Sequence, residues 1–126
     1  MSDCLDMNQD TSRASAIEPD TLERLFALGD GSLRLALCAQ LHADFSRLHA
    51  AVEVVDGARA GRAAHELKGL AATVGALRLA DMARDLDTAA QELAAELRAG
   101  MVAPLQREIG AVLRILSQAS ARPVAE

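Results

Sequence analysis

Aromatic residues are scarce in this chain of 126 residues, which contains two Phe and no Trp or Tyr. Sites that bind single-stranded nucleic acid or a carbohydrate stack their ligand on such rings, so the composition argues against both. Basic residues are also in the minority, because 13 Lys and Arg stand against 18 Asp and Glu, for a net charge of −5. Since a phosphate backbone is bound by a basic surface, we expect no nucleic-acid partner.

Cysteines and long apolar runs are scarce as well. The two cysteines, Cys4 and Cys38, are too few for a disulfide framework and favour a reducing compartment. The longest apolar run, from Leu70 to Leu77, falls short of the roughly 20 residues that span a bilayer. The first residues include acids and lack the apolar stretch of a secretory signal. We therefore expect a cytoplasmic protein that has no membrane segment.

Hydrophobic residues make up 51% of the chain, which is enough for one domain with a buried core. They recur at steps of three and four residues, alanine is abundant, and no strand-like alternation occurs. This periodicity predicts an all-α fold. The apolar faces of the expected helices consist of Leu22, Leu25, Phe26 and Leu28; Leu33, Leu37, Leu41, Phe45, Leu48, Val52 and Val55; Ala60, Ala64, Leu67, Ala71 and Val74; Leu79, Met82, Leu86, Ala90, Leu93 and Leu97; and Leu105, Ile109, Val112 and Leu116.

Helix-starting and helix-breaking residues separate these faces. Pro19 suits a first helical turn and Asp30 suits an N-cap. The expected breaks lie at Gly29, at Asp56 and Gly57, at Gly75, and between Gly100 and Pro104. Four amphipathic helices with short connections fit an antiparallel four-helix bundle, and the short first helix would lie across one end. We predict a helical domain over residues 17–118 between flexible tails at 1–16 and 119–126.

One histidine stands out because the chain has no phosphate-binding glycine loop, no Cys-x-x-Cys and no His-Glu-x-x-His. On the third helix the apolar residues cluster around the direction of Leu67. His65 lies two residues earlier, which turns it about 160° away from that direction. We therefore expect the imidazole of His65 to face solvent, where its neutral form offers a nucleophilic nitrogen.

Small and basic residues surround His65 on the same face of the helix. Gly61 and Arg62 lie about one turn before it, Lys68 and Gly69 about one turn after it, and Ala72 one turn further. A glycine inside a helix costs about 0.5–1 kcal/mol relative to alanine, so a pair of them indicates that a flat surface is needed here. Close helix packing would explain the glycines too, and an exposed histidine on such a helix can be a plain solvated residue.

The string His65-Glu66-Leu67-Lys68-Gly69, followed by Gly75, resembles the histidine-containing phosphotransfer (HPt) domain of multistep phosphorelays. The resemblance extends from about residue 17 to residue 116. It implies a helical bundle that takes a phosphoryl group onto its histidine from an aspartate of one receiver domain and passes it to an aspartate of another. The implied partners are receiver domains of response regulators and a hybrid sensor kinase, and the receiver would bring the Mg²⁺.

The resemblance also implies roles for individual residues. His65 is the position that becomes phosphorylated, Lys68 stabilises the phosphoryl group, and Gly69 lets the receiver approach. Arg62, Gly61 and Ala72 would complete the docking face. Such domains often carry a Gln or Glu 22 residues after the histidine, which hydrogen-bonds the ring nitrogen that is not phosphorylated; here that position is Asp87, whose side chain is shorter. Asp87 is equally explained as a solvated acid of its helix.

Two other interpretations stay open. His-Glu-Leu-Lys also resembles the dimerisation helix of sensor kinases, but there a Thr or Asn and then a Pro follow, whereas this chain has Gly69 and Leu70. A glycine-rich ATP lid and an Asn-bearing nucleotide box are also missing from the sequence, so we expect a phosphoryl carrier without its own ATP site and not an enzyme. The remaining alternative is a helical adaptor that binds a partner without covalent chemistry.

The other reactive side chains predict no further site. His42 and His49 are seven residues apart, and two ligands do not make a metal site without a third. We expect both on the surface, Cys38 as a small buried residue, and Glu66 as a solvated side chain. No metal and no cofactor of the chain's own is expected, and the sequence does not indicate an oligomeric state.

Overall fold

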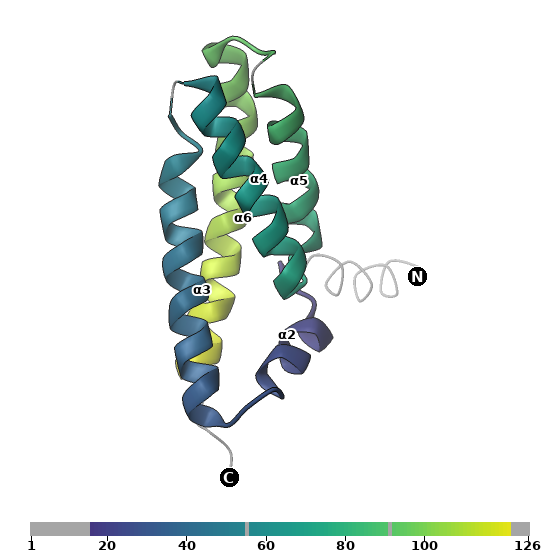
Figure 1. The fold of residues 1–126 in the computed structure, drawn as a ribbon, viewed down its shortest axis with the longest axis vertical. Helices are drawn as coiled ribbons and strands as arrows, with labels where there is room; N and C mark the ends of the chain where they lie inside the picture. The colour runs from purple at the N-terminus through teal and green to yellow at the C-terminus, as the bar shows by residue number, and fades with distance from the viewer. Residues whose placement is uncertain (1–15, 55, 91, 122–126) are drawn as a thin grey trace, which may run out of the picture.

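The computed structural model describes residues 16–54, 56–90 and 92–121. Most of the predicted tails at 1–16 and 119–126 lies outside this range, and Ala16, which was assigned to the first tail, is buried. Its helices are α2 (Pro19–Phe26), α3 (Gly31–Ala51), α4 (Gly57–Val74), α5 (Leu77–Ala89) and α6 (Ala95–Ala121). Helices α3 to α6 run alternately up and down, and the short α2 lies at one end of them (Figure 1). The predicted all-α fold, an antiparallel four-helix bundle with a short N-terminal helix, is confirmed.

The residues that start and stop the helices act largely as their chemistry predicts. Asp30 caps α3 by accepting a hydrogen bond from the Leu33 amide at 3.1 Å. Asp56 caps α4 in the same way, because its Oδ1 accepts from the Ala58 amide at 2.9 Å. Gly75 ends α4 with φ of 86°, a left-handed conformation that glycine adopts without a steric penalty. Both limits of the helix that carries His65 are therefore set by local sequence.

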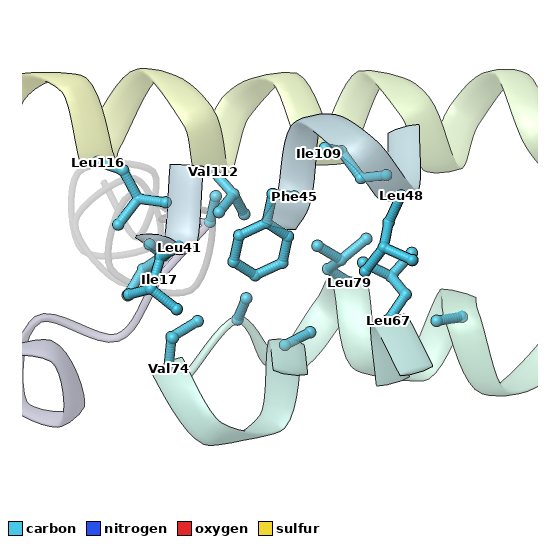
Figure 2. Packing of buried hydrophobic residues seen from close by; sticks show 14 of the residues in the cluster. Ile17, Leu41, Phe45, Leu48, Leu67, Val74, Leu79, Ile109, Val112 and Leu116 are labelled. Atoms are coloured by element: carbon cyan, nitrogen blue, oxygen red, sulfur yellow. The ribbon is translucent and has the colours of Figure 1, made fainter. Parts of the chain in front are cut away.

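The core runs along the axis of the bundle and holds α4 in place. Figure 2 shows Phe45 and Leu48 of α3 close to Leu67 of α4 and Leu79 of α5, and all four are fully buried. Each such side chain contributes roughly 1.5–3 kcal/mol on burial. Because Leu67 is anchored here, the opposite side of α4 is held toward solvent.

The turn between α5 and α6 lies elsewhere than the sequence predicts. Helix α5 ends at Ala89 and not near Gly100, while α6 begins at Ala95 and contains Pro104. The first buried position of α6 is Arg98, which is 4% exposed and donates to the carbonyl oxygens of Ala90 (3.0 Å) and Leu93 (3.3 Å). Because this buried position is occupied by a charged residue, the apolar pattern did not indicate the start of the helix. Pro104 has no N–H to donate, so α6 lacks one backbone hydrogen bond there.

Helix α6 also extends further than predicted at its C-terminal end. It continues to Ala121, beyond the predicted domain limit at residue 118, and Ala119 is buried at 5% exposure. The apolar pattern therefore has one more turn than we assigned to it. In the described residues no helix combines the length and the apolar character that crossing a membrane requires.

Candidate phosphoryl-accepting histidine

His65 lies near the middle of α4 with 70% of its side chain exposed. Its neighbours Ala64 and Leu67 are fully buried, so the packed side of α4 fixes the direction in which the imidazole points. The prediction that His65 faces solvent is confirmed. A rigid helix that presents one exposed imidazole is a suitable support for a nucleophile.

Asp87 of α5 contacts the imidazole of His65. The imidazole Nδ1 lies 3.1 Å from the carboxylate Oδ2, and the Asp87 side chain is 30% exposed. An ionised carboxylate only accepts hydrogen bonds, so Nδ1 carries the proton and donates it. In the neutral ring the lone pair is then on Nε2. The pair therefore selects the nitrogen on which a new bond can form.

Two cations of α4 lie near the histidine in sequence and face outward. Arg62 is exposed and Lys68 is half-buried. In the described part of the chain neither side chain has an ion-pair or hydrogen-bond partner. Their charges are consequently free to meet an anionic group on His65 or on a partner.

Glu66, the residue after the histidine, is directed toward another helix. Its carboxylate accepts two hydrogen bonds from the guanidinium of Arg47 in α3, one of them at 3.3 Å from Nη1. This pairing raises the pKa of the Arg47 guanidinium. Glu66 is exposed as expected, yet it is ion-paired, and its carboxylate is not the group beside the imidazole. Sequence spacing gave no signal for this pair, because its members lie 19 residues apart on different helices.

The two glycines on either side of His65 occupy different environments. A Cβ on Gly69 would meet nothing within 4 Å, and Gly69 and Ala72 are both exposed, so this half of the face is flat and open. Gly61 is buried, and a Cβ added to it would lie 3.4 Å from the Cβ of Ala90, the C-cap residue of α5. The prediction that Gly61 belongs to the exposed docking face is wrong. A residue four positions earlier is turned about 40° around the helix, and here that turn is toward α5.

The remaining reactive side chains form no second centre. His42 is exposed, His49 is half-buried, and Cys38 is 1% exposed, with a thiol whose pKa is raised by burial. Over the described residues no three His, Cys, Asp or Glu side chains gather where they would hold a metal ion.

One comparison with known sequences identifies the family of the chain. Comparisons with curated proteins and with solved structures give no match. The sequence model of the Hpt domain matches residues 32–120, a stretch that includes His65, its partner Asp87 and all four helices of the bundle almost completely. Because this match covers well over half of the chain, the chain belongs to the Hpt domain family, whose membership implies histidine phosphotransfer in phosphorelays.

Proposed function

We propose that this chain is a phosphorelay intermediate that carries the phosphoryl group on Nε2 of His65. The observation that supports it most is the hydrogen bond between His65 Nδ1 and Asp87, on an imidazole that is 70% exposed. The bond leaves the Nε2 lone pair directed away from Asp87, toward the side from which a partner can approach. Hpt domains are carriers that generally have no ATP site of their own, so the phosphoryl group comes from a partner.

The donor is an aspartyl phosphate of a receiver domain. Nε2 attacks its phosphorus, an N–P bond forms, and the P–O bond to the aspartate breaks, so that the aspartate leaves as a carboxylate. Nδ1 keeps its proton throughout, and the ring becomes a phosphoimidazolium. The negative charge of Asp87 stabilises that cation. Transfer to a second receiver is the same step in reverse.

The other residues of the face act through charge and shape. Lys68, one turn after His65, places its ammonium beside the phosphoryl oxygens. Gly69 and Ala72 leave room for the receiver, and Arg62 offers a cation to its acidic pocket. The receiver supplies the Mg²⁺, since phosphoryl transfer depends on positioning and charge neutralisation. A hybrid sensor kinase would stand upstream, and the relay would run in the cytoplasm.

The proposal is tested by incubating the purified protein with a panel of receiver domains from the same genome, each labelled with radioactive phosphate. We expect label that is stable in alkali and labile in acid, as a phosphohistidine is. His65→Gln should abolish it. His42→Gln is the matched control, because His42 is an exposed histidine on another helix, and it should be labelled normally.

Three results would overturn the carrier role. The first is label on Ser, Thr or Asp of this chain, and the second is efficient labelling by ATP alone. The third is a His65→Gln protein that retains full biological activity, which would indicate the adaptor that binds without covalent chemistry.

A further inference from the structure

Two glycines of α4, one turn apart, face the same residue at the end of α5. A Cβ on Gly57 would lie 2.7 Å from the carbonyl oxygen of Ala90, a distance that forces a shift of backbone. A Cβ on Gly61 would lie 3.4 Å from the Ala90 Cβ, so a methyl group is already at close contact there and a larger side chain would add bulk to that contact. The distance between helices depends on the side chains at their contact, and these residues keep it small.

The hydrogen bond of the site belongs to this contact. The same Cβ on Gly61 would lie 4.0 Å from Oδ1 of Asp87, whose other oxygen bonds His65 at 3.1 Å. Gly61 and His65 are four residues apart on α4, and Asp87 of α5 is three residues before Ala90, the C-cap of α5, whose backbone is still helical, so each pair shares a face. The contact of Gly61 with Ala90 therefore sets the distance between α4 and α5 that the Asp87 side chain has to bridge to reach His65.

An aspartate can cross only a narrow gap, because a single methylene separates its carboxylate from the backbone. The buried Arg98 of α6 fixes the end of α5 at this spacing by donating to the Ala90 carbonyl oxygen at 3.0 Å. If α5 moved outward, the Asp87 carboxylate would lose its hydrogen bond with Nδ1 of His65.

We propose that Gly61 is a positioning residue. Its missing side chain brings α5 close enough for the short Asp87 to hold Nδ1 of His65, and so it sets the tautomer that keeps Nε2 free. The consequence for transfer rests on the proposed function, whereas the tautomer does not, because it is measured without phosphate.

The test is a double-mutant cycle between Gly61→Val and Asp87→Glu, read in two ways. Nitrogen-15 NMR of the neutral His65 ring reports which nitrogen carries the proton, and the receiver assay reports the rate of transfer. We expect Gly61→Val to lose the preference for the Nδ1–H form and to transfer about tenfold more slowly. The longer Glu should restore the tautomer and bring the rate to within about threefold of wild type.

Gly100→Val is the matched control, because Gly100 is an exposed glycine within α6 whose Cβ would meet nothing within 4 Å. It should leave the tautomer and the rate as they are. A folded Gly61→Val protein with the wild-type tautomer would overturn the proposal, and so would a double variant in which Glu restores nothing. If the wild type accepts no phosphoryl group at all, the proposed function fails, and the tautomer still decides the role of Gly61.

Should Gly61→Val fail to fold, the cycle is repeated with Gly61→Ala, whose methyl group would stand at close contact with the Ala90 Cβ (3.4 Å) and so displace α5 less than valine does. In the Gly61→Ala background, Asp87→Glu should then lower the population of the Nδ1–H tautomer of His65 by less than it does in the wild type. An equal loss in both backgrounds would reject the positioning role.

Discussion

Gly61 and Gly69 lie one turn before and one turn after His65 on the same helix, but their surroundings differ. Gly61 is buried against Ala90 at the end of α5, while the space above Gly69 is empty in this structure. Both cost α4 the same helix propensity. The first glycine lets one helix approach another within the fold, and the second leaves a gap that only a partner from outside would fill. A glycine in a helix therefore indicates a close approach without saying from which side.

The largest effect is expected for Gly69→Gln. A long side chain there would stand between His65 and the receiver. Transfer requires the reacting atoms of the two proteins to come within about 3–3.5 Å of each other, so we expect it to slow about a hundredfold. The free energy of unfolding should stay the same or rise by up to about 1 kcal/mol, because glycine is the poorer helix former. Thermal melts and the receiver assay measure the two effects. A variant that melts early and loses activity in proportion would mean that Gly69 serves packing instead.

For Gly61→Gln we expect the larger effect on stability and the smaller one on the rate of transfer. The side chain has to enter the contact with Ala90, and overpacking of this kind costs about 1–3 kcal/mol of unfolding free energy. Urea denaturation followed by circular dichroism gives this number, with Gly69→Gln as the matched partner. Equal stability of the two variants would remove the distinction between a folding glycine and a docking glycine.

The difference between the glycines also marks how far the sequence could predict the molecule. Asp30, Asp56 and Gly75 act on their own local backbone, so the limits of α3 and α4 follow largely from sequence. The exposed direction of His65 followed from the buried direction of Leu67 in the same way. These are properties of one helix, and periodicity within one helix is enough to obtain them.

The properties that depend on two helices were beyond that reasoning. Arg98 lies at a buried position because the Ala90 and Leu93 carbonyls accept its hydrogen bonds, and without knowledge of that turn the start of α6 was missed. The burial of Gly61 depends on which side of α4 is covered by α5. Asp87 could be named as a partner of His65 only through a resemblance, because nothing within its own helix distinguishes it from a solvated acid.

A smaller effect is expected at the two cations that flank the histidine. Lys68→Ala should fold normally and transfer about tenfold more slowly, which corresponds to the loss of one charge-assisted contact with the phosphoryl oxygens. Arg62→Ala is the control for a general loss of positive charge, and it should change mainly the salt dependence of receiver binding. Equal losses of transfer rate in the two variants would mean that Lys68 contributes only to the general positive charge of this face.

The smallest effect is expected at Glu66, the neighbour of the histidine that points to α3. Its ion pair with Arg47 is exposed on both sides, since each side chain is 52% accessible, and such pairs are worth about 0–1 kcal/mol. Glu66→Gln should therefore change the melting temperature slightly, lose even that difference at high salt, and leave the rate of transfer from a receiver unchanged. The resemblance of His-Glu-Leu-Lys to the dimerisation helix of sensor kinases implies instead a glutamate that assists phosphorylation from ATP, and a slower transfer in Glu66→Gln would favour that alternative. Arg47→Gln breaks the ion pair from its other end and is the matched control. A rate that falls in Glu66→Gln and not in Arg47→Gln would show that the carboxylate acts on His65 itself, and the division of α4 into a docking side and a packing side would then have to be redrawn.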